Sequence, residues 1–122
     1  MEPAMMLQVS TYLFGLTALG GVAMGLIRFS SGKNPPSWLA MMHGFLAAAG
    51  LTLLAYAVLV LDAPSLAFMA LLLFVVGSAG GIALNLVYHL KGIPLPKWIV
   101  VVHALISVLA LVLLYMAAFG GD

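Results

Sequence analysis

Four long apolar stretches, separated by three short polar segments, make up nearly the whole chain. The apolar stretches run over Met5–Phe29, Trp38–Leu61, Ser65–Leu90 and Trp98–Phe119. A helix that spans the hydrocarbon core of a membrane needs about 20 apolar residues, so each stretch is long enough. Short connections make successive helices antiparallel neighbours. The pattern therefore predicts an all-α membrane protein, a four-helix up-down-up-down bundle that forms a single transmembrane domain over residues 1–122.

Composition agrees with a protein whose main partner is the lipid bilayer. Hydrophobic residues make up 66% of the 122 residues and charged residues 6%, which is more apolar surface than the interior of a soluble domain holds. We therefore expect a four-pass integral membrane protein, in the inner membrane of a bacterium, without a nucleic-acid partner. The chain has no cysteine, which excludes disulfides, thiolate metal sites, iron–sulfur clusters and covalently attached haem.

The placement of the few charges predicts the orientation in the membrane. All basic residues lie in or beside the first and third polar segments: Arg28, Lys33, Lys91 and Lys97. The acidic residues lie at the opposite ends of the predicted helices: Glu2, Asp62 and Asp122. Short loops rich in lysine and arginine stay in the cytoplasm. Both termini are therefore predicted to be non-cytoplasmic.

The two halves of the chain resemble each other. Residues 13–57 aligned with 73–117 share fourteen identities in 45 positions without a gap. The matches include pairs that are unusual in apolar sequence: Gly20/Gly80, Gly21/Gly81, Pro36/Pro96, Trp38/Trp98 and His43/His103. This pattern predicts a tandem repeat of two helical hairpins, the first over about residues 5–61 and the second over about 65–119. Both hairpins would insert in the same sense and be related by an axis along the membrane normal.

A histidine stands inside each repeat, five residues after its tryptophan. At 1.5 Å per residue, His43 and His103 lie roughly 8 Å inside their helices. A polar side chain at this depth needs a partner, because lipid offers no hydrogen bonds. In the predicted bundle the second and fourth helices are diagonal, so the two histidines can face each other across its axis. One interpretation is that each simply forms a hydrogen bond with a neighbouring helix.

Small residues occupy the same level on the first and third helices. They are Gly21, Gly25, Gly81 and Asn85, the last of which is also predicted to donate a hydrogen bond between helices. One interpretation is close helix packing, since Gly21-x-x-x-Gly25 is a small-xxx-small interface. The other interpretation is that the layer leaves room for a flat porphyrin whose iron takes two axial imidazoles.

At these two histidines the chain resembles the membrane b-type cytochromes, in the broad sense of the b561-like four-helix bundles. The resemblance covers the helical bundle and the positions His43 and His103. It implies one haem b near the cytoplasmic side, with these residues as its iron ligands, and electron exchange with quinone or an attached redox subunit. His89 and Arg28, at the same side, are candidates for contact with a haem propionate or a quinone.

Two functions remain open at this point. The first is a small haem-b electron-transfer protein or redox subunit. The second is a cofactor-free accessory or structural subunit of a larger membrane complex, since tiny hydrophobic proteins with short loops often have that role. Other membrane or redox subunits, or further copies of this chain, are expected partners in both cases. No motif of a stand-alone enzyme is visible, so an electron carrier or a subunit is the more natural assignment.

Overall fold

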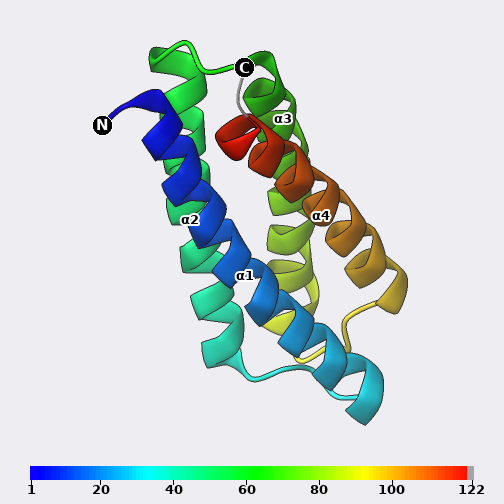
Figure 1. The fold of residues 1–122 in the computed structure, drawn as a ribbon. Helices are drawn as coiled ribbons and strands as arrows, with labels where there is room; N and C mark the ends of the chain where they lie inside the picture. The colour runs from blue at the N-terminus through cyan, green and yellow to red at the C-terminus, as the bar shows by residue number, and fades with distance from the viewer. Residues whose placement is uncertain (121–122) are drawn as a thin grey trace.

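The computed structural model describes residues 1–120 and is entirely helical in its regular structure (Figure 1). The elements are α1 (Pro3–Ser31), α2 (Ser37–Val60), α3 (Ser65–Ala83), the π-helical η1 (Leu84–His89) and α4 (Lys97–Phe119). Four helices, one of them α3 continued by η1, are long and apolar enough to span a membrane. The prediction of an all-α integral membrane protein is thus confirmed. Gly121 and Asp122 lie outside the described residues.

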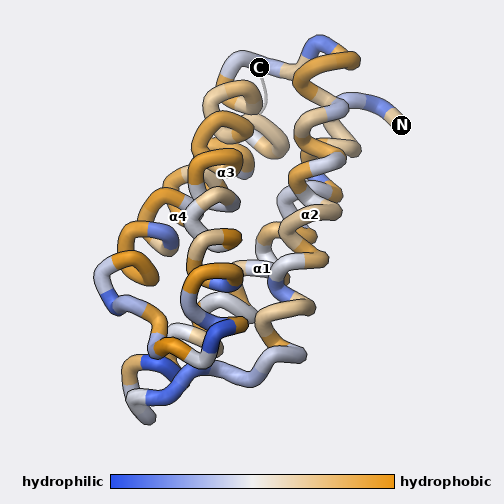
Figure 2. The backbone as a smooth tube through the Cα atoms, turned by 180° about the vertical axis from the view of Figure 1, so that it is seen from behind, coloured by the Kyte–Doolittle hydropathy of each residue, from blue (hydrophilic) through white to orange (hydrophobic). Residues whose placement is uncertain are grey.

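The helices run antiparallel in chain order, so their connections gather at two ends of the bundle (Figure 1). The segments 32–36 and 90–96 lie at one end of the bundle, which we call the loop end. The N-terminus and the turn 61–64 lie at the other end, which we call the terminal end. Figure 2 shows hydrophilic segments gathered at the loop end, whereas most of the helical length is apolar. This is the end that holds every basic residue of the chain.

Local sequence explains where the helices begin and end. Pro3 begins α1, two residues earlier than predicted, because proline suits the first helical turn, where its missing N–H is not needed. Gly32 ends α1 with φ 72°, a left-handed conformation that glycine adopts without strain. Asp62 has φ 54° in the tight turn between α2 and α3, and a short polar residue tolerates this better than an apolar one.

Each helix packs against two neighbours. α1 packs against α2 and α4, and α3 packs against α4 and α2, while the packing within each hairpin is more extensive than the packing between hairpins. α1 and α3 are therefore diagonal, as are α2 and α4. Across the first diagonal, Phe14 and Phe74 stack in parallel, with ring centres 3.7 Å apart and an angle of 7° between the rings.

The packed core fills the terminal half of the bundle. The buried apolar residues of this half come from all four helices: Met6, Leu7, Phe14, Leu54, Ala57, Ala67, Ala70, Leu71, Phe74, Ala110, Leu114 and Ala118. The Phe14–Phe74 stack lies at the inner limit of this set. Among residues 1–120, Leu84 is the one buried apolar side chain that the helices contribute in the loop-end half.

The loop-end half is loosely packed. Gly25 lies eleven residues after Phe14, which at 3.6 residues per turn brings it to within about 20° of the same inward face of α1. A Cβ atom added at Gly25 would nevertheless meet no neighbouring helix within 4 Å. The space beside this glycine is therefore open, although the position faces the interior of the bundle.

Polar bonds between the two loops close the loop end. The Asn34 side chain donates from Nδ2 to the carbonyl oxygen of Ile93 and accepts from the backbone N–H of Leu95, both at 2.9 Å. These bonds join the loop of the first hairpin to that of the second. Where apolar packing is sparse, hydrogen bonds thus supply part of the contact between the hairpins.

Candidate functional site

The structure brings His43 and His103 together across the α2–α4 diagonal. Their ring centres are 6.2 Å apart and the ring planes meet at 68°. Both side chains are partly buried, and both lie just beyond the Phe14–Phe74 stack, on its loop-end side. The facing arrangement that the sequence predicted for these two residues is therefore present.

Each histidine ring is held by a backbone carbonyl of the neighbouring helix in its own hairpin. Nδ1–H of His43 donates to the carbonyl oxygen of Thr17 at 2.8 Å, and Nδ1–H of His103 donates to that of Gly77 at 2.7 Å. A carbonyl oxygen only accepts hydrogen bonds, so the proton of each neutral ring is on Nδ1. The lone pair of each Nε2 then remains available to a metal or another donor.

The two imidazole rings pack against glycines of α1 and α3. A Cβ atom at Gly21 would lie 3.0 Å from Cε1 of His43, and one at Gly81 would lie 3.1 Å from Cε1 of His103. Ordinary carbon contacts are about 3.5–4.0 Å, so a side chain at either position would displace the imidazole. The glycines at 21 and 81 thus let each ring lie directly against the backbone whose carbonyl it binds.

These contacts match between residues 60 positions apart. The pairs Thr17/Gly77, Gly21/Gly81 and His43/His103 occupy equivalent places, and Phe14 stacks on its own counterpart Phe74. The sequence comparison singled out the histidines and glycines but missed Phe14 and Phe74, although both stand among the aligned identities. It also missed Thr17 and Gly77 as hydrogen-bond acceptors, because every residue has a backbone carbonyl and its use cannot be read from the residue type.

The donor set fits an iron porphyrin better than an all-protein metal site. Within residues 1–120, no three His, Cys, Asp or Glu side chains gather closely enough to hold an ion. A structural or catalytic zinc site needs three or four protein ligands, whereas a haem iron needs only axial ligands from the protein. Ligating histidines almost always donate their second N–H to a backbone carbonyl or a carboxylate, as both of these do.

The spacing of the two rings also fits one metal ion between them. With each metal–nitrogen distance at about 2.0–2.1 Å and about 1 Å from nitrogen to ring centre, two imidazoles on opposite sides of one ion have centres about 6 Å apart. The separation of 6.2 Å between His43 and His103 agrees with this value. The open space beside Gly25 lies one turn further toward the loop end.

No protein-family model, curated protein or solved structure matches this chain. The assignment of a function therefore depends on the histidine pair and on the residues around it. The remaining candidates from the sequence are Asn85, Arg28 and His89, all of which lie toward the loop end.

Asn85 lies in η1, the π-helical turn that ends the third span. Its backbone carbonyl accepts the N–H of Leu90 at 2.9 Å, a bond from residue i+5 that defines the wider π turn. The side chain is partly buried. Neither histidine Nδ1 bonds to it, since both use backbone carbonyls. The apolar pattern gave no sign of the π turn, because hydropathy does not distinguish π from α geometry.

Arg28 and His89 both take part in bonds between the loops. Arg28 donates from Nε to the carbonyl oxygen of Leu95 at 2.9 Å and from Nη1 to that of Gly32 at 3.0 Å. His89 donates from Nε2 to the carbonyl oxygen of Pro35 at 2.8 Å. These bonds leave the two N–H groups of Nη2 and the second N–H of Nη1 on Arg28 as donors, and Nδ1 of His89 as an acceptor, for contact with a ligand. Both residues are partly buried at the floor of the loosely packed half.

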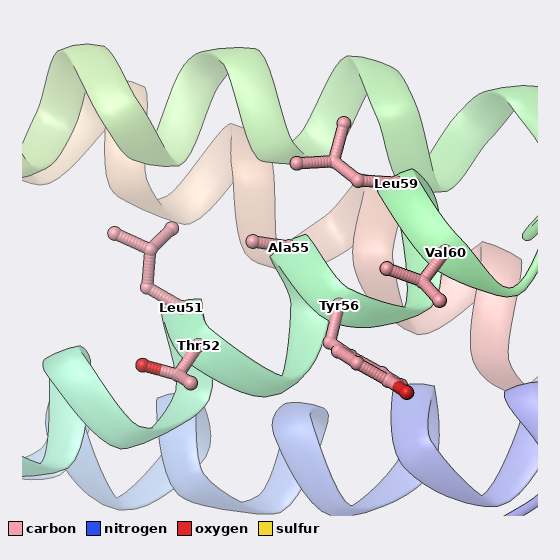
Figure 3. A pocket seen from close by; sticks show the side chains of 6 residues that line it. All are labelled: Leu51, Thr52, Ala55, Tyr56, Leu59 and Val60. Atoms are coloured by element: carbon pink, nitrogen blue, oxygen red, sulfur yellow. The ribbon is translucent and has the colours of Figure 1, made fainter.

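A shallow open groove on the surface of α2 is unrelated to the histidines (Figure 3). It lies in the terminal half, and its lining residues all belong to α2: Leu51, Thr52, Ala55, Tyr56, Leu59 and Val60. The Thr52 hydroxyl, its most polar group besides Tyr56, is bonded to the carbonyl oxygen of Ala48 within the same helix. The groove therefore offers no set of converging polar groups.

Proposed function

We propose that this chain is a small membrane electron-transfer protein or redox subunit that binds one haem b between His43 and His103. The observation that carries the proposal is the arrangement of the two imidazoles. Their ring centres are 6.2 Å apart, and each ring has Nδ1–H bonded to a carbonyl and Nε2 available. The proposal also draws on Gly25, where an added Cβ atom would meet nothing within 4 Å, because a porphyrin would need open space on this side of the histidines.

Each residue of the site has a separate role in this proposal. His43 and His103 bind the iron, and Gly21 and Gly81 pack against their rings. Gly25 and Asn85 line the remaining space at the same side. Arg28 offers N–H groups toward the propionates or a quinone, and Nδ1 of His89, whose Nε2–H is bonded to Pro35, can accept a hydrogen bond from the hydroxyl of a reduced quinone. When bound, haem b supplies one-electron oxidation and reduction. The chain excludes water from that chemistry on its terminal side, where the Phe14–Phe74 stack begins the packed core.

The duplicated architecture and the orientation belong to the same proposal. The two hairpins are proposed to be a tandem repeat, which is supported by the matching carbonyl bonds of His43 and His103. The loop end is proposed to face the cytoplasm of a bacterium, since it carries all four basic residues. Electrons would then be exchanged with a quinone or an attached redox subunit at that side.

An absorption spectrum tests the haem directly. The protein purified from a haem-replete host should show a Soret band and the sharp reduced bands of six-coordinate low-spin haem. His43→Ala or His103→Ala should abolish the spectrum or convert it to that of five-coordinate haem. Met42→Ala is the matched control, because Met42 adjoins His43 in sequence but is 54% exposed on the outside of the bundle. A folded native protein without colour would refute the proposal and favour the cofactor-free accessory subunit.

A further inference from the structure

Two cationic side chains lie where α1 ends and α4 begins. Arg28, in the last turn of α1, donates from Nε to the carbonyl oxygen of Leu95, which shortly precedes α4. Lys97, the first residue of α4, places its Nζ over the ring of Phe29, 5.5 Å from the ring centre. Both contacts join the end of α1 to the start of α4. The two positive charges therefore belong to the loop end of one helix junction, the α1–α4 junction.

The charge at this junction has no counter-ion among the described residues. Within residues 1–120 the carboxylate side chains are those of Glu2 and Asp62, and both lie at the terminal end. The Phe29 ring attracts the ammonium of Lys97 through its quadrupole but carries no net charge. The contact thus orients the ammonium without neutralising it, and Lys97 is exposed. An anion from outside the described chain can pair with it.

The corresponding junction between α3 and α2 lacks these cations. Sixty positions from Arg28 stands Tyr88, and sixty positions from Lys97 stands Ser37. The preference for lysine and arginine in cytoplasmic loops accounts for basic residues at the loop end in general. It does not distinguish one helix junction from the other. The pairing of two cations at the α1–α4 junction is therefore more specific than the orientation of the bundle requires.

The surface beside the two cations has the character of a membrane interface. Trp98, which follows Lys97, is 71% exposed, and Phe29 is also exposed. Exposed aromatic residues at the ends of membrane helices lie at the level of the lipid headgroups. The anion available at that level is the phosphate of a phospholipid, and basic pockets between membrane helices bind anionic headgroups.

We propose that the loop end of the α1–α4 junction binds the headgroup phosphate of an anionic phospholipid. Lys97 contacts the phosphate through its ammonium, which has three N–H donors, and Arg28 adds a second positive charge that attracts it. A zwitterionic lipid is a poorer ligand, because its own cationic group offsets the phosphate. This inference goes beyond the proposed function and does not depend on bound haem.

The two tryptophans of the chain provide a comparison within one protein. Trp98 adjoins Lys97, whereas Trp38, which is 62% exposed, adjoins Ser37. Trp38→Phe and Trp98→Phe each leave a single fluorescent reporter in the full chain. The proteins are reconstituted in phosphatidylcholine vesicles that contain phosphatidylglycerol brominated near the headgroup end of its acyl chains. Bromine quenches tryptophan only at close range, and vesicles with unbrominated phosphatidylglycerol correct for quenching within the protein.

We expect the preference for phosphatidylglycerol over phosphatidylcholine to be about fivefold greater at Trp98 than at Trp38, the effect of one lysine near a lipid surface. Lys97→Gln should reduce the preference at Trp98 to that at Trp38, whereas Lys97→Arg keeps the charge and should retain it. Lys91→Gln is the matched control. It removes the same charge from the loop end, but Lys91 follows the third span, which is diagonal to α1.

The preference at Trp98 should therefore survive Lys91→Gln. Equal preference at the two tryptophans of the native charge pattern would overturn the proposal. An equal loss in Lys97→Gln and Lys91→Gln would overturn it as well, since it would reveal general attraction to the surface and no site at the α1–α4 junction. Neither result bears on the absorption spectrum, so this proposal and the proposed function fail separately.

Discussion

Replacement of Gly50 by alanine should destabilise the bundle by overfilling the contact between α2 and Phe14. A Cβ atom at Gly50 would lie 2.9 Å from both Cδ2 and Cε2 of the Phe14 ring. An ordinary carbon contact is about 3.5–4.0 Å, so the ring or the helix must move by roughly 0.6–1.1 Å. Phe14 is also stacked on Phe74 at 3.7 Å, and Ser10 bonds the carbonyl of Gly50 at 2.8 Å. Either movement therefore disturbs a second contact.

The expected magnitude follows from a comparison of two alanine variants. Overpacking of a tight contact typically costs about 1–3 kcal/mol. Alanine also favours a helix over glycine by up to about 1 kcal/mol, which partly masks the cost at Gly50. Gly15→Ala gains the same helix propensity without a clash, since its Cβ atom meets nothing within 4 Å. Gly50→Ala should thus be less stable than Gly15→Ala by about 1–3 kcal/mol.

Unfolding of the purified variants in mixed micelles, followed by circular dichroism as the fraction of denaturing detergent rises, measures this difference. A second substitution identifies the cause. Phe14→Leu should recover part of the loss in the Gly50→Ala background, because contacting residues are energetically coupled. Equal stability of the two alanine variants, or strictly additive effects of Gly50→Ala and Phe14→Leu, would show that the ring does not limit the space at Gly50.

Three further predictions concern orientation and packing. Cysteines introduced at Ser31 and Gly121 should react with impermeant reagents from opposite sides of the membrane; labelling from one side would contradict the proposed topology. Asn34→Ala should destabilise the loop end by about 1–3 kcal/mol, the sum of two hydrogen bonds, with faster amide hydrogen exchange in both loops; exchange no faster than in Lys33→Ala would count against this role. Leu114→Ala, at a fully buried position, should cost about 2–5 kcal/mol in the same detergent unfolding, and an unchanged midpoint would mean that the terminal half is not the packed core.

The four helices could be predicted from the sequence because each is apolar over nearly its whole length. A membrane-spanning stretch of this length forms a helix whatever its tertiary contacts are. It placed the boundary of α1 two residues short at each end, since Pro3 and Ser31 are not apolar although both are helical. It did not predict the π turn at Leu84–His89, because the wider turn changes hydrogen-bond partners and leaves hydropathy unaltered. Hydropathy also gave no indication that the core would be packed in one half only.

The histidine pair was predictable as a pair, but its chemistry was not. Equal depth on diagonal helices followed from the alignment of the two halves. The protonation of Nδ1 depends on the backbone carbonyls of Thr17 and Gly77, which every residue type possesses, so the sequence alone could not predict it. The glycines were predicted to leave room beside the histidines. The structure shows that Gly21 and Gly81 contact the rings themselves, and that the open space is beside Gly25.

The unequal packing of the two halves limits what a haem in this bundle could do. All three histidines of the chain lie in the loop-end half, and the terminal half is filled by apolar side chains from all four helices. On the proposed function, a single redox centre would then lie near one face, with the Phe14–Phe74 stack between it and the other. The chain would exchange electrons at the loop end, and transfer across the whole membrane would need a second redox centre in a partner.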